Sequence, residues 1–493
     1  MNTPIVRLYG LLLLLFAALI GFTSYWAVFD ANALKDNPEN RRPLIVEQTV
    51  KRGVIKTSDG VVVAQSHPVG GGRHPVYVRD YPQGSMFANP VGYSFVEVGQ
   101  SGIEHSENGV LAGERNEFTS ILDQIRGVPQ QGDNVTLTID SNAQRVATQA
   151  LQSAISSTPG ATGSGGAVVA LDPSTGAVKA MASVPGYDPN TVKDAGVFKK
   201  LNRQSSGAPL LNRATQSTYP PGSTMKVVTA AAALDSGRFT PSSVLSGASP
   251  QTIDGLPLFN AGNEQFGDIT MTDALTHSVN TYFAQIGEQL GSSTMVEYMK
   301  RFGFYSDPQL DYPGGQMAPS GAYNSSGHLV TSGFDVGRVA IGQGGAEGQD
   351  LATPLQMAEV AATVANGGKL MRPTFVQQVT DPDGRVTGKL SPQVQGTVIS
   401  PQTATELTDM MTHVTQEGTA AGLTVGGVTF AGKTGTAEIG DPANGINQPW
   451  FIAFAPAVNP QVAVAATIER CQGCFGAEVA GPIATQVMES LLK

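Results

Sequence analysis

The chain opens with an almost unbroken apolar run over residues 8–28. This is about the twenty residues that a helix needs to cross a bilayer, and Trp26 near its end fits an interfacial aromatic anchor. Ala31-Asn32-Ala33 has the form of a signal-peptidase site. However, the run is longer than the roughly 7–15 residues usual in a signal peptide. The pattern therefore favours a tail of residues 1–7 and an uncleaved transmembrane helix at 8–28, with a cleaved signal peptide as the alternative.

Short strand-like runs broken by Gly and Pro follow from about residue 42 to residue 138. Val61–Val63 and Val76–Val78 are examples, and the second leads into the turn-forming Tyr81-Pro82-Gln83-Gly84. No catalytic residue types collect in this stretch. We therefore predict a β-rich, non-catalytic domain over residues 30–158.

A helix is predicted from Ser141 to about Ala154, because Ser141 and Gln144 have the capping-box spacing. Residues 156–166 are small and polar, which is typical of a linker or a long turn. We therefore place the boundary between two domains there, with the second domain over residues 160–493.

The second domain has strand patterns near both of its ends and a helical pattern at its C-terminus. The predicted strands are Ala167–Leu171, Val178–Ser183, Val428–Ala431, Phe451–Ala455 and Val462–Ile468. The first two read as a hairpin, and Glu478–Leu492 has one apolar helical face. Two early strands and three late ones, with helices between, predict one sheet built from both ends of an α+β domain.

Composition removes several classes of function. The 493 residues carry a net charge of −10, which argues against a nucleic-acid partner. The six histidines are scattered without a metal-binding pattern, so we expect no metal site. The two cysteines, Cys471 and Cys474, have no thioredoxin-like context and no second pair to complete a zinc site. A small structural disulfide is favoured over free thiols, without a catalytic role.

The strongest chemical signal is Ser223 followed by Lys226, directly after Tyr219-Pro220-Pro221-Gly222. The prolines and glycine exclude helix before Ser223, so the serine is predicted in the first helical turn, where backbone N–H groups are unpaired. Lys226 lies one turn along the same face and can act as a base if its pKa is depressed. The spacing alone is weak, because Ser490 and Lys493 repeat it at a charged helix end without supporting context.

Two further motifs follow in order. Ser278-Val279-Asn280 is an S-x-N pattern that by itself would be read as an ordinary helix terminus or turn. Lys433-Thr434-Gly435-Thr436 follows the predicted strand Val428–Ala431 and offers a cation, two hydroxyls and backbone N–H groups. Such groups suit a carboxylate and an oxyanion. The three motifs together are far more specific than any one of them.

These motifs are those of penicillin-binding proteins and serine β-lactamases. The wider chain resembles the class B penicillin-binding proteins, and within them the actinobacterial penicillin-binding protein A group. The resemblance is weak over residues 65–135 and strong from 167 onward. The supporting stretches are Arg52-Gly53-Val54-Ile55 with Asp59-Gly60, Ala170–Gly176, Asn212-Arg213-Ala214, Gly342-Gln343-Gly344 and Thr353–Ala358. The resemblance implies a transpeptidase domain with helices on both faces of an antiparallel sheet. It also implies that residues 30–158 form a pedestal of the dimerisation type.

The resemblance also implies a division of labour for cleavage of a D-Ala-D-Ala peptide stem. Ser223 would attack the carbonyl between the two alanines, with Lys226 as the proton acceptor. Ser278 would relay the proton to the departing amine, Lys433 would supply positive potential, and Asn280 would hold an amide carbonyl of the substrate.

Substrate binding would fall to Thr434, Gly435 and Thr436. The two threonine hydroxyls would bind the terminal carboxylate, and the backbone N–H groups of Ser223 and Thr436 would form the oxyanion hole. An amine from a neighbouring stem would then take the acyl group. The scheme needs no metal or organic cofactor, and β-lactams would acylate the same serine.

Three alternatives remain open. A β-lactamase would share the motifs but would usually be smaller and unanchored, and class A enzymes have Ser-Asp-Asn where this chain has Ser-Val-Asn. A D,D-carboxypeptidase differs only in using water as acceptor. A non-catalytic penicillin-binding scaffold of the wall-synthesis machinery is disfavoured, because every necessary side chain is present.

The resemblance finally implies a place in the cell and a partner. The segment before residue 160 is too short for a glycan-polymerising domain, so a monofunctional transpeptidase is expected. It would be a single-pass protein of the cell membrane with its catalytic domain on the extracytoplasmic side. By analogy it would work in growth or division with a membrane glycosyltransferase of the RodA/FtsW type.

Overall fold

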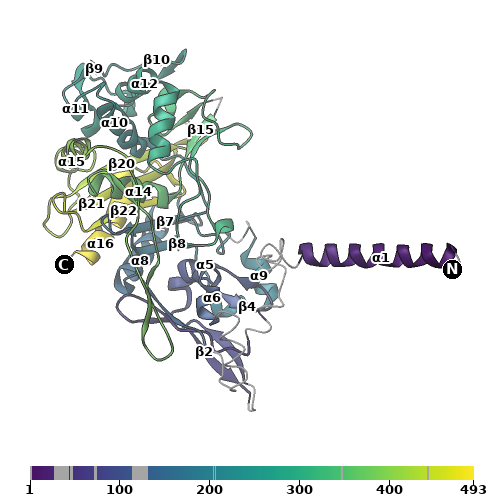
Figure 1. Cartoon of the computed structure of the whole chain (residues 1–493). Coiled ribbons are helices and arrows are strands. Elements are labelled where there is room, and N and C mark those ends of the chain that lie inside the picture. Colours follow the sequence, from purple (N-terminus) through teal and green to yellow (C-terminus); the bar gives the residue numbers. More distant parts are fainter. Residues whose placement is uncertain are drawn as a thin grey trace.

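The computed structural model describes residues 3–26, 44, 48–70, 75–113, 131–203, 205, 207–345, 348–440 and 444–492. Figure 1 shows an N-terminal helix, a β-rich lower part and a larger upper part that contains the C-terminus. The helices are α1 Thr3–Ser24, α4 Ala88–Val91, α5 Gly102–Ser106, α6 Asn108–Leu111, α8 Ser141–Ser157, α9 Ala195–Leu201, α10 Lys226–Asp235, α11 Met271–Thr276, α12 Asn280–Arg301, α13 Val336–Val339, α14 Pro354–Ala365, α15 Pro401–Gln416 and α16 Gly476–Leu491. Single 3₁₀ turns are η2 Gly84–Phe87, η3 Pro189–Thr191, η5 Gly222–Met225, η6 Ala261–Asn263 and η7 Gly314–Gln316.

Helix α1 is apolar and has no buried residue. It begins at Thr3, ahead of the predicted start at residue 8, and ends at Ser24, while residues 27 and 28 of the predicted run lie outside the described residues. Among the described residues it is the one helix long and apolar enough to cross a membrane. Its length and composition fit either a membrane anchor or a signal sequence. The candidate cleavage site at Ala31-Asn32-Ala33 also lies outside the described residues.

The sheet of the upper part combines strands from the beginning and the end of the domain, as predicted. Its strands run in the order β20-β21-β22-β7-β8, all antiparallel, with β23 pairing β21. They are β7 Gly166–Leu171, β8 Val178–Val184, β20 Ala431–Glu438, β21 Ile446–Ala455, β22 Val462–Ile468 and β23 Cys471–Gln472. The central strands β7 and β22 are buried at every position. This confirms one antiparallel sheet made from both ends of the domain.

Helices cover this sheet as the predicted fold class requires. Helices α8 and α16 pack on each other, with α8 against β8 and α16 against β21 and β22. Helix α14 packs against β7 and β22, and α15 packs against β20 (Figure 1). Buried apolar residues of the helices and strands join in one core, which holds the sheet edge at β20 rigidly in place.

One local prediction, the capping box at the start of the helix ahead of the sheet, is wrong. The cap of α8 is Asp140, whose carboxylate accepts the N–H of Ala143, so Ser141 and Gln144 form no capping box. Gln144 is buried, and its amide exchanges hydrogen bonds with the backbone of Met181. The amide of Gln144, which a capping box would have used, is thus hydrogen-bonded to Met181 of β8 instead. Residues 158–165 form the long turn that the sequence offered as the alternative to a linker, and Ala161 in this turn is fully buried.

The lower part is built on a sheet with the order β18-β17-β6-β1-β2-β3. Its strands are β1 Ile55–Lys56, β2 Val62–Val69, β3 Val76–Asp80, β6 Asn134–Leu137, β17 Val376–Thr380 and β18 Val386–Lys389. The β-rich pedestal is therefore present. However, β17 and β18 come from the range assigned to the second domain, and β17 pairs with β6. The pedestal sheet is thus completed by the hairpin β17–β18, which lies more than 200 residues later in the chain than β6.

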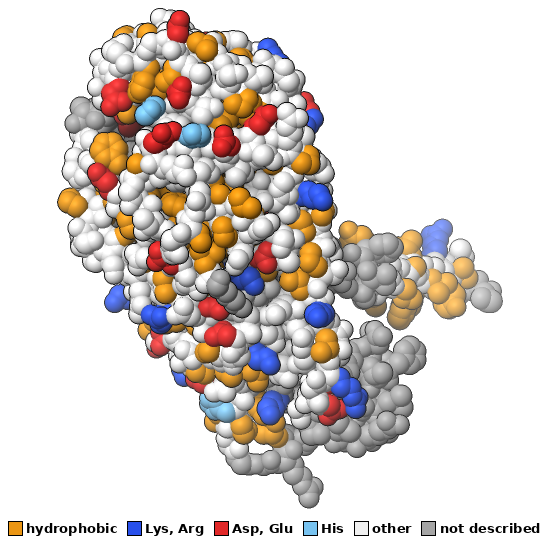
Figure 2. Space-filling view, turned by 90° about the vertical axis from the view of Figure 1, so that its left-hand side faces the viewer, with side chains coloured by type: hydrophobic (Ala, Val, Ile, Leu, Met, Phe, Trp, Pro, Cys, Tyr) orange, Lys and Arg blue, Asp and Glu red, His pale blue; other side chains and the backbone are white. Residues whose placement is uncertain are grey.

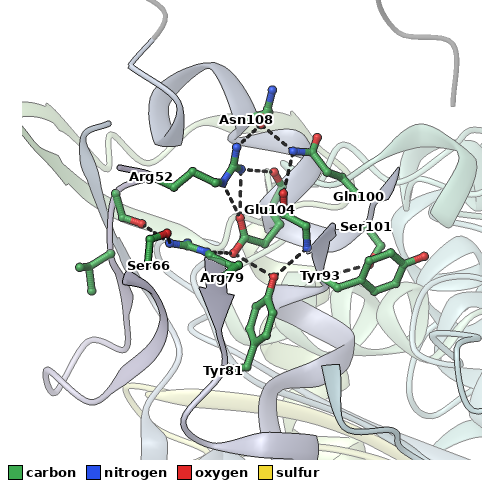
Figure 3. A network of polar contacts seen from close by, with 12 residues as sticks. Arg52, Ser66, Arg79, Tyr81, Tyr93, Gln100, Ser101, Glu104 and Asn108 are labelled. Atoms are coloured by element: carbon green, nitrogen blue, oxygen red, sulfur yellow. Dashed lines mark hydrogen bonds and ion pairs between the residues drawn. The ribbon is translucent and has the colours of Figure 1, made fainter. Parts of the chain in front are cut away.

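A buried ionic cluster lies beside this sheet (Figure 3). The carboxylate of Glu104 accepts hydrogen bonds from Nε of Arg79 at 2.5 Å and from Nη2 of Arg52 at 3.0 Å. The hydroxyl of Tyr81 also donates to this carboxylate, at 3.3 Å. Burial alone would raise the pKa of Glu104, but the two arginines outweigh it, so the pKa is lowered. The cluster ties β3 to helix α5 and to Arg52 ahead of β1.

The remaining strands form small sheets around the main body. They are β4 Ser94–Phe95 with β5 Gly99–Gln100, β9 Val244–Ser246 with β12 Asp268–Thr270, β10 Gln251–Ile253 with β11 Leu256–Leu258, β13 Gly321–Asn324 with β14 Gly344–Gly345 and β15 Gly348–Leu351, and β16 Lys369–Met371 with β19 Val394–Thr397. Figure 2 shows acidic and basic side chains mixed over one face, without a broad basic field there.

Candidate active site

Ser223 lies in η5, a single 3₁₀ turn that leads directly into α10. The preceding Gly222 has a φ of 54°, which favours glycine, and its N–H donates to the carbonyl of Gly342 at 2.9 Å. A Cβ on Gly222 would lie 3.1 Å from the backbone N of Ala437 and 3.3 Å from that of Thr436. The serine turn therefore lies directly against β20. Helical structure begins at this turn, as the Pro-Pro-Gly break predicted.

Lys226 is the first residue of α10 and is fully buried. Its Nζ donates to the carbonyl of Ser278 at 2.6 Å, to Oδ1 of Asn280 at 2.7 Å and to Oγ of Ser278 at 3.2 Å. No hydrogen bond joins Lys226 to Ser223 in the part of the chain that the structure describes. Burial holds the pKa of Lys226 well below its usual value, and the charge of Lys433 lowers it further.

Ser278 and Asn280 lie at the junction between α11 and α12. Ser278 has a φ of 58°, an uncommon conformation for serine that presents its hydroxyl between two lysines. Nζ of Lys433 donates to this hydroxyl at 2.9 Å. The amide of Asn280 is fixed at both ends, because Oδ1 accepts from Lys226 and Nδ2 donates to the carbonyl of Phe259 at 3.0 Å.

The Lys-Thr-Gly-Thr segment lies within a strand and does not follow one. The predicted strand Val428–Ala431 is wrong, since β20 begins at Ala431 and continues to Glu438. Residues 428–430 are not strand, and the segment pairs with β21 through register partners such as Lys433 and Ile452. The polar residues are tolerated in a buried strand because their side chains are hydrogen-bonded to neighbouring residues.

The side chains of this strand have defined partners. Nζ of Lys433 also donates to the carbonyl of Thr434 at 3.0 Å. The hydroxyl of Thr434 is hydrogen-bonded to that of Thr419 at 2.7 Å, and the hydroxyl of Thr436 accepts the N–H of Gly476 at 3.2 Å. A Cβ on Gly435 would lie 2.8 Å from the carbonyl of Pro221, so glycine allows β20 to approach the serine turn.

The electrostatics of the site are set by two buried lysines that share one hydroxyl. Lys226 and Lys433 are both fully buried. No acidic side chain among the described residues forms an ion pair with either lysine. Burial lowers the pKa of Lys433 to about 7. A neutral amine at neutral pH is therefore physically accessible, which is what a lysine base requires.

A second group of residues braces the serine turn and was not assigned a role from sequence. Arg213 and Glu469 form an ion pair at 2.7 Å, and the hydroxyl of Tyr219 donates to the same carboxylate at 2.9 Å. Nε1 of Trp450 donates to the carbonyl of Pro220 at 2.9 Å. Arg213 belongs to Asn212-Arg213-Ala214, one of the stretches that support the family resemblance. No local signal in the sequence indicates Glu469 as its partner.

The remaining chemical predictions lie outside this site. Cys471 and Cys474 are joined as a disulfide on the loop that leads to α16. The alternative Ser490 bonds back to the carbonyl of Val487 on α16, and its partner Lys493 lies outside the described residues. Among the described residues, no group of three or more His, Cys, Asp or Glu side chains is placed to hold a metal ion.

Comparisons with known proteins agree with this geometry. The penicillin-binding protein transpeptidase domain matches residues 166–489, and the penicillin-binding protein A dimerisation domain matches residues 52–135. The peptidoglycan D,D-transpeptidase PbpA of Mycolicibacterium smegmatis is 36% identical over 516 residues, covering 100% of this chain and 99% of the relative. That of Mycobacterium tuberculosis is 34% identical over 512 residues, again covering 100% and 99%.

A solved structure extends the likeness to the fold. Penicillin-binding protein A from M. tuberculosis, as its ceftriaxone acyl-enzyme complex, superposes with a TM-score of 0.79 at 32% identity. The match covers 91% of this chain and 100% of that one. The chain therefore belongs to the penicillin-binding transpeptidase family, as a peptidoglycan D,D-transpeptidase related over its whole length to the actinobacterial PbpA proteins.

Proposed function

We propose that Ser223 is the nucleophile that carries the acyl group during peptidoglycan cross-linking. The observation that supports this most is the meeting of Lys226, three residues after Ser223, with Lys433 at the hydroxyl of Ser278. Neither lysine has a carboxylate partner among the described residues, so the site favours a neutral amine next to a cation. That combination suits removal of a proton from one hydroxyl and its delivery elsewhere.

In this proposal the oxygen of Ser223 attacks the carbonyl between the two terminal D-alanines, and Lys226 takes the hydroxyl proton. The C–N bond breaks, and Ser278 passes a proton to the departing amine of D-alanine while Lys433 stabilises the relay. The backbone N–H groups of Ser223 and Thr436 bind the developing oxyanion, a contribution of about 3 kcal/mol per donor. An acceptor amine then forms the new amide and returns the proton to Ser223.

Substrate recognition in the same proposal uses the remaining motif residues. Asn280 has one amide proton on Phe259, which leaves the second for a carbonyl of the stem. Thr434 and Thr436 hold the terminal carboxylate by their hydroxyls, and Gly435 keeps the strand close to the serine. β-Lactams carry an equivalent carboxylate, so they are expected to acylate Ser223.

Transpeptidation is proposed over D-alanine carboxypeptidation because the relatives over the whole chain carry the name D,D-transpeptidase. The test supplies purified, uncross-linked glycan strands and measures both cross-linked muropeptides and free D-alanine. Cross-links that disappear in Ser223→Ala are expected. D-alanine release without cross-links would favour the carboxypeptidase, and neither product from protein that still binds penicillin would favour a scaffold. Rapid release of hydrolysed penicillin would instead indicate a β-lactamase.

We further propose that α1 is an uncleaved anchor and that the body lies on the extracytoplasmic side of the cell membrane. The length and hydropathy of Thr3–Ser24 support this, and so does the extracytoplasmic location of peptidoglycan stems. Mass spectrometry of the chain extracted from membranes is expected to find the α1 sequence intact. A mature N-terminus beyond Ala33 would contradict the proposal.

A membrane glycosyltransferase of the RodA/FtsW type is proposed as the partner, contacted through the anchor and residues 30–158. The pedestal contributes no residue to the active site described above, which leaves its surface for such a contact. Co-purification from membranes should depend on these residues. Retention of the glycosyltransferase by full-length chain whose anchor has been replaced by an unrelated helix, with pedestal surface residues also changed, would contradict this.

A further inference from the structure

A threonine outside the three motifs lies directly on one of them. Thr419 follows α15 and is exposed, yet its hydroxyl is hydrogen-bonded to the hydroxyl of Thr434 at 2.7 Å. Helix α15 packs against β20, and the residues that follow this helix reach the strand that carries the Lys-Thr-Gly-Thr segment at Thr434. Thr419 is thus at the rim of the proposed carboxylate site.

The loop is held there by contacts on both sides. The N–H of Thr419 donates to the carbonyl of Thr276, the last residue of α11, at 3.2 Å. A Cβ on the preceding Gly418 would lie 2.3 Å from the same carbonyl, so glycine permits this close approach. The next residue, Ala420, is fully buried, and its N–H donates to the carbonyl of Val414 at 3.0 Å. The loop therefore bridges the helix that leads to Ser278 and the strand of Thr434.

The direction of the hydroxyl–hydroxyl bond follows from what a carboxylate can do. An ionised carboxylate only accepts hydrogen bonds, and a threonine hydroxyl has one proton. If Thr434 gives its proton to a carboxylate, Thr419 must be the donor in the bond between them. Such a chain of donors strengthens each member.

The second threonine of the site has the same arrangement. Its hydroxyl, on Thr436, accepts the N–H of Gly476 at 3.2 Å, which leaves the hydroxyl proton of Thr436 free to point at a ligand. Each proposed carboxylate-binding hydroxyl therefore has a donor behind it. In one case the donor is a fixed backbone N–H, and in the other it is the side chain of Thr419.

We propose that Thr419 is a positioning residue for the substrate carboxylate, aligning the hydroxyl of Thr434 through the donor chain Thr419 to Thr434 to carboxylate. This rests on the proposed function, in which Thr434 binds the terminal carboxylate. It also predicts that serine can replace Thr419 and that valine, which has the same shape without the hydroxyl, cannot.

The experiment measures the second-order rate constant of acylation by a fluorescent penicillin. It uses the full-length chain and the variants Thr419→Val, Thr419→Ser, Thr434→Val and the double variant Thr419→Val/Thr434→Val. Thr419→Val is expected to lower the rate constant about five- to tenfold, the value of one hydrogen bond, and Thr419→Ser to stay within about twofold of the unchanged chain. In the Thr434→Val background, Thr419→Val should have no further effect.

Unchanged acylation by Thr419→Val would overturn the proposal, and so would effects that multiply in the double variant. Equal losses in the valine and serine variants would also overturn it, because they would indicate a structural role. Thermal unfolding and the labelled fraction at saturation identify any loss caused by misfolding. Failure of the unchanged chain to label at Ser223 would instead contradict the proposed function itself, so the two failures are distinguishable.

Discussion

Two buried clusters of charge in this chain are built in opposite ways. In the pedestal, two arginines meet the carboxylate of Glu104, and the pKa of that carboxyl is lowered (Figure 3). In the catalytic domain, Lys226 and Lys433 meet at a serine hydroxyl, with no carboxylate partner in the described part of the chain, and the pKa of both lysines is lowered. In the first cluster, opposite charges stabilise the ionised form of Glu104. In the second, burial destabilises the protonated form of both lysines.

The difference separates stability from chemistry. A buried ion pair loses several kcal/mol when one partner is removed, because the other charge is left without compensation. A buried lysine that faces no carboxylate among the described residues gains little from its charge, so its pKa is lowered, in the case of Lys433 to about 7. The pedestal cluster is expected to matter for folding and the lysine pair for reaction rate.

The largest effect is expected from Lys226→Met, which removes one member of the uncompensated pair. Loss of a general base lowers rates by about 10²–10⁴-fold, so acylation by penicillin should slow by about 10³-fold. Thermal stability should stay the same or rise, because an apolar side chain of similar length replaces an amine whose charge burial disfavours. Stopped-flow labelling and calorimetry measure the two quantities. Lys199→Met, at an exposed position of α9, is the matched control and should change neither. Acylation of Lys226→Met within threefold of the control would contradict the contrast.

Glu104→Gln tests the paired cluster. The amide keeps the shape but leaves two buried guanidinium groups without their carboxylate. We expect a loss of about 3–5 kcal/mol in the free energy of unfolding, measured by urea denaturation. The folded fraction should label with penicillin at the normal rate.

The exposed pair Arg301–Glu297 provides the control for that substitution, since the two side chains are 41% and 55% exposed. Glu297→Gln should cost no more than about 0.5 kcal/mol. A loss for Glu104→Gln as small as that for Glu297→Gln would show that the buried cluster is not a stabilising element.

The pH dependence of stability sharpens the comparison further. The pKa of Lys433 is about 7 in the folded chain and about 10.4 in an unfolded one. Between these values the unfolded chain binds one more proton, so stability rises with pH by up to about 1.4 kcal/mol per unit from this group. The gain is complete above the unfolded pKa and is lost as pH falls toward 7.

Lys433→Met should remove that slope. Urea denaturation at pH 7, 8 and 9 measures it as the difference between the two chains, with Lys199→Met again as control. A difference that does not change with pH would mean that Lys433 keeps its proton in the fold.

The smallest effect is expected at Glu469, a paired carboxylate whose side chain is 28% exposed. Tyr219→Phe removes the hydroxyl that donates to Glu469 and leaves the Arg213–Glu469 ion pair in place. Unfolding should lose about 1 kcal/mol, and acylation should change less than about threefold. An acylation loss above about tenfold would give this brace a direct part in positioning Ser223.

Much of the fold could be predicted because its signals are local. The strands β7, β8 and β22 are continuous apolar runs between turns, and their early and late positions imply one sheet. Pro220, Pro221 and Gly222 indicate the start of the helix that carries Ser223. The three motifs, taken in order, suggested one site, and Lys226, Ser278 and Lys433 are joined there by hydrogen bonds.

What failed depends on partners distant in sequence. The apolar run at 428–431 suggested a strand, but the strand β20 begins at Ala431 and contains the polar residues of the candidate site. Functional positions break the pattern in this way because their side chains serve a ligand and not the core. Likewise the pairing of β17 with β6, and the contact of Thr419 with Thr434, have no local signature.

The central claim is that the uncompensated lysine pair serves acyl transfer to Ser223. The most direct test is a peptide mass map of the full-length chain after penicillin treatment, compared with the Lys226→Met variant. We expect one penicilloyl adduct on the peptide that contains Ser223, forming about 10³-fold more slowly in the variant but at the same residue. An adduct on Ser278 or on any other residue, or one that forms at the same rate without Lys226, would contradict it.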